Sequence, residues 1–266
     1  MHVRSALGLA PLLWAGLLAP AHALDQPEAA TTRTAKQGGL TAPAQRFAVT
    51  AANPLAVDAG VEILKAGGSA LDAVVAVQAV LGLVEPQSSG IAGGAFLLHW
   101  DGREVQALDG RETAPAAATP ALFLKPDGKP LPMRDAILSG LSTGTPGVLA
   151  MLAEGHRRHG RLPWARLFEP AIRLAEQGFA VSPRLHELLS GETALRNDPI
   201  AAAYFFDAAG APRAVGTVLK NPAYAAVLRR VARDGVKGFY EGPVAADIVA
   251  RVKGHARPGL LTTADL

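Results

Sequence analysis

Apolar residues recur with a helical period in the first part of the chain, between residues 54 and 66. Residues three or four positions apart share one face of a helix. The apolar positions are Leu55, Val57, Val61, Ile63 and Leu64. Asn53 and Pro54 precede them, and asparagine at the N-cap followed by proline in the first turn favours a helix start. The glycine pair at 67–68 is expected to end this helix.

A second run, from residue 70 to residue 83, is apolar at almost every position. A helix that is apolar all round is buried on most sides. Ser69 precedes the run and Asp72 lies three residues later, which is the spacing of a capping box. Pro86 is expected to end the helix. The run therefore predicts a helix in the core.

The pattern changes to that of strands after a glycine-rich stretch at 90–94. Residues 95–100 predict a buried strand and residues 105–108 predict its partner. Asp101 and Gly102 between them are a strong signal for a tight turn. The polar tetrad DGRE occupies 109–112 and follows the second strand. The sequence thus places Arg111 directly behind a hairpin.

Helical patterns dominate the remainder, and most of the helix starts lie at or beside proline. The expected helices cover residues 147–156, 163–177, 183–189, 222–233 and 244–253. A short β-run at 47–50 precedes the first helix. A proline-rich loop at 115–132 carries a short helical piece near 122–123. We therefore expect an α+β protein that is mostly helical.

The first 23 residues have the order of a secretory signal peptide, with a basic start, an apolar run at 6–20 and the cleavage sequence AHA at 21–23. The apolar run is too short to span a bilayer comfortably. We expect cleavage after Ala23, a flexible lead-in at 24–45, and a periplasmic or secreted protein without membrane association. A buried N-terminal helix is the alternative.

Composition narrows the function classes. The 266 residues carry a net charge of +3 that is spread along the chain, which argues against a nucleic-acid partner. Cysteine is absent, which excludes disulfides and thiolate metal sites. His156 and His159 are three residues apart, but no carboxylate lies nearby in a metal-site pattern and the flanking arginines repel a cation. We expect a solvated helix end there, and neither a metal nor a cofactor.

Two glycine-rich motifs each allow a structural and a functional interpretation. The stretch 90–94 leads into a strand, whereas a dinucleotide fingerprint needs the strand before the glycines. It either lines a ligand site with bare N–H groups or permits close packing. The sequence GLSTG at 140–144 fits the G-x-S-x-G pattern of α/β-hydrolases, which would make Ser142 a nucleophile. The alternative is a loop that caps the next helix.

Arg111 also has two interpretations. It can be a structural arginine that pairs with Asp109 or Glu112. A guanidinium is equally the side chain best suited to grip a carboxylate through two parallel hydrogen bonds. The sequence therefore permits an acidic small-molecule ligand at Arg111 without requiring one.

Several long motifs resemble the γ-glutamyltransferase family, also called glutathione hydrolases, and occur in the family's order from about residue 46 to residue 266. They are AANPLAVDAGVEILKAGGSALDAVVAVQAVLGLVEPQSSGIAGGAFLL, ALDGRETAPAAATPALFL, LSGLSTGTPG, NPAYAAVLRRVARDGVKGFYEGPVA and GLLTTADL. The resemblance implies an N-terminal nucleophile hydrolase sandwich, with two β-sheets between helical layers. It also implies that Arg111 binds the α-carboxylate of the donor.

The resemblance further implies a precursor that cuts itself into a large and a small subunit. The new N-terminal threonine of the small subunit would take the γ-glutamyl group of glutathione as an ester, with its own α-amino group as base. Leu266 falls within what resembles the large subunit. We therefore expect residues 46–266 to be its N-terminal portion, the nucleophile to lie beyond Leu266, and this part alone to be inactive.

Two details of the motifs qualify the resemblance. Ala92 and Ala95 stand where the family usually has glycine, so the loop is expected to be stiffer. Thr262 and Thr263 do not inherit the nucleophile's role, because they belong to a different motif. They are expected to cap the start of a helix.

The expected partners are glutathione or another γ-glutamyl donor, an amino-acid or peptide acceptor, and the small subunit of the same precursor. Three alternatives stay open. One is a related acylase that acts on β-lactam side chains or poly-γ-glutamate. The others are a serine esterase that uses Ser142 and a non-catalytic periplasmic binding module that uses Arg111.

Overall fold

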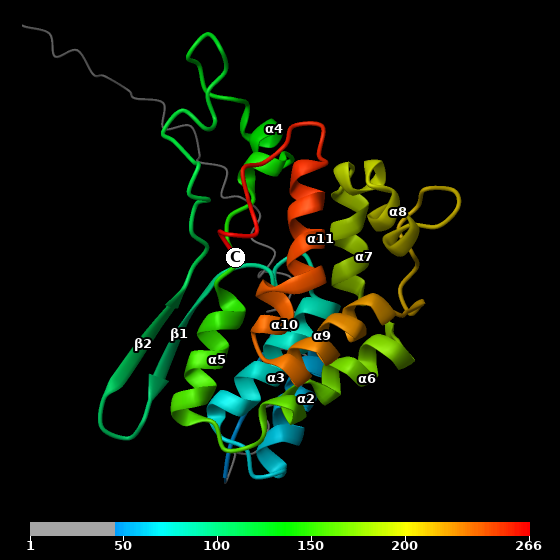
Figure 1. Cartoon of the computed structure of the whole chain (residues 1–266). Coiled ribbons are helices and arrows are strands. Elements are labelled where there is room, and N and C mark those ends of the chain that lie inside the picture. The colour runs from blue at the N-terminus through cyan, green and yellow to red at the C-terminus, as the bar shows by residue number, and fades with distance from the viewer. Residues whose placement is uncertain (1–45) are drawn as a thin grey trace, which may run out of the picture. The chain divides into compact units, whose positions relative to one another are not determined.

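The computed structural model describes residues 46–266, which are drawn in colour in Figure 1. The expected signal peptide (1–23) and lead-in (24–45) lie outside the described residues. Within the described part, strands form two antiparallel two-stranded sheets, and most of the other elements are helices. This part is therefore an α+β structure that is mostly helical, as the sequence predicts.

Helix α2 (Pro54–Lys65) begins where its sequence predicts. The side-chain oxygen of Asn53 accepts a hydrogen bond from the Leu55 N–H at 3.0 Å, which satisfies one of the free donors of the first turn. The helix ends before Gly67, whose φ of 91° lies in the left-handed region that glycine tolerates best.

Helix α3 (Ala70–Val84) is the centre of the core. It begins with the expected capping box between Ser69 and Asp72, and it packs against α2, α5 and α6. Val75 and Val80 are fully buried. The apolar run therefore predicts both the helix and its burial.

The other helices follow in a series that supports the core and the hairpin. They are α4 (Met133–Ile137), α5 (Val148–His159), α6 (Glu169–Gln177), α7 (Pro183–Gly191), α8 (Pro199–Phe205), α9 (Pro222–Asp234), α10 (Lys237–Tyr240) and α11 (Gly242–Lys253), with 3-10 turns η1 (Gly140–Ser142), η2 (Trp164–Phe168) and η3 (Ala194–Asn197). Proline occupies the first or second position of α6, α7, α8, α9 and α11. None of the helices within residues 46–266 has the length and apolar character needed to cross a membrane.

Strands β1 (Ala95–Trp100) and β2 (Val105–Gly110) form the predicted hairpin, with Leu97 opposite Leu108. Figure 1 shows this hairpin beside α5. The prediction of a buried first strand is wrong for one of its faces. Leu97 is buried, whereas Phe96 and Leu98 are 69% and 74% exposed. Side chains alternate between the faces of a strand, and only one face of the hairpin packs on the helices.

Two local predictions are wrong. Residues 47–50 form no strand, because no neighbouring strand pairs with them in the described part, and residues 122–123 lie in turns, not in a helix. The short elements α8 and α10 and the sheet of β3 (Phe179–Ala180) with β4 (Val218–Leu219) were not predicted. Such short pieces carry too few residues for a periodic signal.

Asp72 connects α3 to the segment after α5, although its position in an apolar helix suggests only a cap. Its carboxylate is fully buried. Oδ2 accepts hydrogen bonds from the Ser69 N–H at 2.8 Å, the Arg161 N–H at 2.9 Å and the Leu162 N–H at 3.1 Å. One carboxylate oxygen thus satisfies backbone donors from two parts of the chain.

We expect Asp72→Ala to lower the free energy of unfolding of the purified protein by roughly 3–5 kcal/mol, because it removes a buried carboxylate and leaves three partly buried N–H groups without their acceptor. Urea denaturation with an unchanged m-value would measure this loss. Asp58→Ala is the matched control, since Asp58 is exposed on α2 and should change stability by less than about 0.5 kcal/mol. A loss below about 1 kcal/mol for Asp72→Ala would contradict its anchoring role.

Candidate functional site

Arg111 directly follows β2, at the base of the hairpin. Gly110, the last residue of β2, pairs with Ala95 and lies against the start of α5. A Cβ added to Gly110 would stand 2.6 Å from the Met151 Cβ and 3.1 Å from the Gly147 carbonyl oxygen. Only a residue without a side chain allows this approach. The close contact fixes the backbone from which Arg111 projects.

The guanidinium of Arg111 is largely exposed and makes one ion pair within residues 46–266. Its Nη1 lies 3.2 Å from Oε2 of Glu112, and the two side chains are 58% and 32% exposed. The Arg111 backbone N–H donates to Oδ1 of Asp109 at 2.9 Å. An exposed ion pair contributes about 0–1 kcal/mol, and a guanidinium carries five N–H donors. Arg111 therefore has the structural pairing that the sequence allowed and also retains donors for a carboxylate.

The glycine-rich stretch 90–94 packs against the backbone next to Arg111 and against the start of α5. The carbonyl oxygen of Gly93 accepts hydrogen bonds from the N–H groups of Gly147 at 3.0 Å and Val148 at 3.1 Å. A Cβ added to Gly94 would stand 2.8 Å from the backbone nitrogen of Glu112. Close packing therefore requires at least this glycine, which supports the structural interpretation of the stretch.

Ala92 and Ala95, which are expected to stiffen the loop, lie beside this contact. Ala92 is exposed, and Ala95 is half-buried at the start of β1. Neither occupies the place of Gly94, where the backbone of Glu112 comes closest. The loop thus approaches the Arg111 segment at Gly94 and not at either alanine.

A buried charge cluster anchors the start of the same loop. The carboxylate of Glu85 accepts hydrogen bonds from the side chains of Asn53 at 2.9 Å, Gln87 at 2.6 Å and Arg184 at 2.6 Å. The Glu85 carbonyl oxygen accepts the N–H groups of residues 88–89. Sequence reasoning missed this cluster. Its only signal was a glutamate, followed by proline, at the end of an apolar helix.

Ser142 does not have the surroundings of an activated nucleophile. It lies in η1, and its Oγ is 2.9 Å from the carbonyl oxygens of both Ile137 and Ser139. No histidine within residues 46–266 makes a hydrogen bond to it. A serine nucleophile needs an adjacent base within hydrogen-bonding distance. The geometry therefore favours the interpretation of GLSTG as a structural loop.

The two histidines of α5 are not the solvated helix end that the sequence suggests. His156 is 19% exposed, and its Nε2 lies 3.5 Å from Oδ1 of buried Asp72. The His159 ring stacks on His99 with 4.0 Å between ring centroids. Partial burial, and next the charge of His159, lower the pKa of His99. Within residues 46–266, no group of three or more histidine and acidic side chains is arranged to hold a metal ion.

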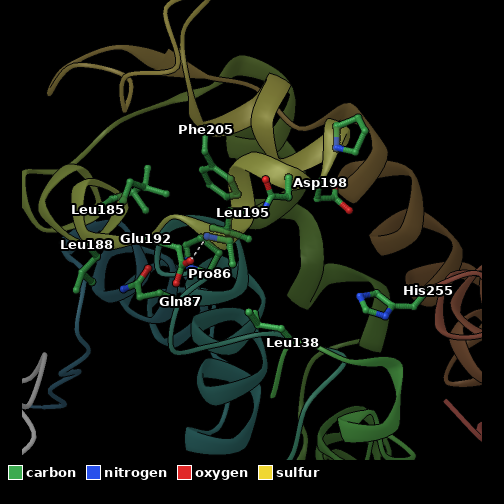
Figure 2. Close-up of a pocket in the computed structure, with 14 residues that line it drawn as sticks. Pro86, Gln87, Leu138, Leu185, Leu188, Glu192, Leu195, Asp198, Phe205 and His255 are labelled. Carbon is green, nitrogen blue, oxygen red and sulfur yellow. Dashed lines mark hydrogen bonds between the residues drawn. The ribbon is translucent and has the colours of Figure 1, made fainter. Parts of the chain in front are cut away.

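One cavity of the described part has a lining that does not include Arg111. It has a volume of about 760 Å³ and is lined mainly by leucines of α7 and by Leu195 and Phe205. Figure 2 shows two carboxylates, Glu192 and Asp198, among the lining side chains. Both are already engaged, because Glu192 accepts the Ala194 N–H at 2.5 Å and Asp198 caps α8. The two carboxylates of this cavity therefore already serve structural hydrogen bonds.

Residues 56–266 match the family described as gamma-glutamyltranspeptidase. The chain belongs to the γ-glutamyltranspeptidase family. A Bacillus subtilis (strain 168) relative, glutathione hydrolase proenzyme, is 36% identical over 220 residues, which are 82% of this chain and 37% of the relative. The chain thus spans about 37% of the length of that relative.

Two solved structures extend the likeness to the fold. The γ-glutamyltranspeptidase of Helicobacter pylori superposes with a TM-score of 0.79 at 32% identity, covering 85% of this chain and 64% of that one. A cephalosporin acylase from Bacillus halodurans has a TM-score of 0.69 at 33% identity, covering 85% and 44%. These matches confirm that the chain has part of the N-terminal nucleophile hydrolase fold. The stacked sheets of the full sandwich are not complete within residues 46–266.

We expect Ser142→Ala to leave the hydrolysis of γ-glutamyl-p-nitroanilide and of p-nitrophenyl acetate within about twofold of wild type, since the hydroxyl has no base beside it. The steady-state rates of both hydrolysis reactions, measured on the enzyme made from the full-length precursor, would test this. Ser139→Ala, at the neighbouring loop serine, is the control for local loop damage. If Ser142→Ala alone lowers the hydrolysis rate more than about a hundredfold in folded protein, the result would support the serine-esterase alternative.

Proposed function

We propose that this chain is the N-terminal portion of the large subunit of an enzyme that transfers or hydrolyses γ-glutamyl groups of glutathione and related compounds. The observation that carries the proposal is Arg111. In a chain of this family, Arg111 directly follows the tightly packed base of the hairpin. Its guanidinium has further N–H donors besides the one that pairs with Glu112. A planar fork held in this way suits the α-carboxylate of a γ-glutamyl donor.

The proposed chemistry proceeds in two steps. A threonine hydroxyl beyond Leu266 attacks the γ-carbonyl carbon of the donor, and the amine leaves with a proton as an ester forms. Water or the amino group of an acceptor then attacks the ester and releases the threonine. Within residues 46–266, the part of Arg111 is to bind and orient the donor.

The exposed apolar face of the hairpin supports a second subunit from the same precursor. Phe96, Leu98, Trp100 and Val105 are each at least 60% exposed. Contiguous apolar surface of this kind marks an interaction site. The B. subtilis relative is named a proenzyme, which also supports a precursor that is cut. We propose that the small subunit covers this face.

A second candidate activity is removal of acyl side chains from β-lactams, and the similarity to the B. halodurans cephalosporin acylase favours it. Poly-γ-glutamate is a further candidate substrate. An arginine that grips an α-carboxylate is useful only for donors that carry this group. Comparing glutathione with a butyryl amide, which lacks the α-amino and α-carboxylate groups, therefore separates the candidates.

We expect Arg111→Ala in the processed enzyme to lower kcat/KM for glutathione by about one and a half to three and a half decades. Removing one partner of a buried charge pair costs roughly 2–5 kcal/mol, and about 1.4 kcal/mol corresponds to one decade. The loss should fall mainly on KM if the carboxylate is held equally in ground and transition states. Arg111→Lys should recover only part of it, because the ammonium lacks the planar fork.

The matched control is Arg103→Ala, since Arg103 is an exposed arginine at the opposite end of the same hairpin. It should leave kcat/KM within about twofold. On a donor without the α-carboxylate, wild type and Arg111→Ala should differ little. If Arg111→Ala keeps kcat/KM for glutathione within a factor of about three in folded, processed protein, Arg111 has only a structural role.

We also propose that the protein is exported to the periplasm or medium. The basic start, the apolar run at 6–20 and the sequence AHA at 21–23 support this. The expected mature N-terminus is Leu24. Mass spectrometry of protein recovered from the periplasm or medium would measure it, and an intact Met1 would contradict the proposal.

A further inference from the structure

Asp265 bridges two parts of the chain that are 149 residues apart. Its Oδ1 accepts a hydrogen bond from the backbone N–H of Ala116 at 2.8 Å. Ala116 lies five residues after Arg111, in the exposed segment that leaves the hairpin. The contact therefore ties the segment behind the candidate binding residue to the far end of the described chain.

The carboxylate of Asp265 is itself held in place by Thr262. Oδ2 accepts the Thr262 N–H at 2.8 Å and the Thr262 hydroxyl at 2.6 Å, and the Asp265 N–H returns a bond to the Thr262 carbonyl oxygen at 3.2 Å. Residues 263–265 form a turn. The expectation that they open a helix is not met within the described residues, although Thr262 and Asp265 have the spacing of a helix cap.

Leu261 fixes this turn to the body of the protein. Its side chain is fully buried with Val249 and Val252 of α11. The hydrogen bonds from Ala116 first, and then those from Thr262, hold the pKa of Asp265 below its usual range. The carboxylate is therefore charged at neutral pH, and charge strengthens a bond to a backbone N–H.

The segment from Arg111 to Ala116 is consequently tied at three points. The Arg111 N–H donates to Asp109. Thr113 exchanges backbone hydrogen bonds with Thr145, at 3.3 Å and 2.8 Å. Asp265 supplies the third tie, at Ala116. A short segment held at both ends and in the middle has few conformations left to lose when a ligand binds.

We propose that Asp265 is a positioning residue for γ-glutamyl donors, which acts by fixing the segment that carries Arg111. This inference rests on the proposed function of Arg111. It assigns a role to the GLLTTADL motif that does not involve its threonines as nucleophiles. Asp265 itself makes no contact with the substrate in this role.

Ala116→Pro tests the bond with little other change. Proline lacks the N–H that Asp265 accepts. Residues 115–118 form a turn in which the Ala118 N–H donates to the Pro115 carbonyl oxygen at 2.8 Å, and proline is favoured at the second position of such a turn. The variant therefore removes the bond while it preserves the turn.

In the processed full-length enzyme, we expect Ala116→Pro and Asp265→Ala each to raise KM for glutathione about three- to tenfold, with kcat within about twofold. The double variant should be no worse than either single one, because both remove the same bond. A donor without the α-carboxylate should be affected by neither. General loss of folding would instead lower kcat for both donors and leave KM unchanged.

The matched control is Asp127→Ala. Asp127 lies in the same loop region and its Oδ1 accepts the Lys129 N–H at 3.1 Å, so it is a carboxylate in a similar exposed turn. It should leave KM within about twofold. Additive effects in the double variant, or an unchanged KM in both single variants, would overturn the positioning role.

Amide hydrogen exchange gives a readout that does not depend on turnover. Asp265→Ala should speed exchange in the peptide that contains Thr113 and Ala118, while Asp127→Ala should not. Unchanged exchange there would overturn the proposal even in an active enzyme. If wild type shows no γ-glutamyl turnover, the proposed function fails, and this exchange measurement still decides whether Asp265 orders the segment.

Discussion

The arrangement around Arg111 depends on one constraint, the close approach of backbone to backbone where the hairpin meets the start of α5. A Cβ on Gly147 would stand 2.5 Å from the Gly110 carbonyl oxygen, and one on Gly144 would stand 2.8 Å from that of Thr113. Side chains at these positions would push the hairpin base off the helix. The glycines therefore matter here because the absence of side chains lets the two backbone segments pack in direct contact. This contact fixes the position of the Arg111 backbone.

Two buried carboxylates connect this region to the helices of the core. Glu85 holds the beginning of the glycine-rich loop to α2 and α7 through Asn53 and Arg184. Asp72 holds α3 to the segment after α5. Each carboxylate is costly to bury unless its lone pairs are occupied. Glu85 accepts hydrogen bonds at both oxygens, and Asp72 accepts three at Oδ2. Directional contacts therefore join the apolar core to the loop that follows α3.

Sequence reasoning predicted the features that depend on neighbouring residues. It did not predict the features that depend on tertiary packing or on contacts between distant residues. The caps at Asn53 and Ser69 and the Asp101-Gly102 turn depend only on near neighbours, and the structure has all three. The exposure of Phe96 depends on what packs against the strand, which its own sequence does not specify. The hydrogen bond between Ala116 and Asp265 joins residues 149 positions apart, and no local sequence pattern predicts it.

The pairing of Arg111 with Glu112 bears on how such a site would bind an anion. At about 4 Å in water, two unit charges interact by only about 1 kcal/mol, so an exposed Glu112 neither blocks Arg111 strongly nor repels an incoming carboxylate strongly. In the proposed two-subunit enzyme, a covering subunit would remove water from this surface. The same guanidinium would then interact with a carboxylate several times more strongly. The gain in binding would thus come from assembly, while this chain contributes the direction in which the fork points.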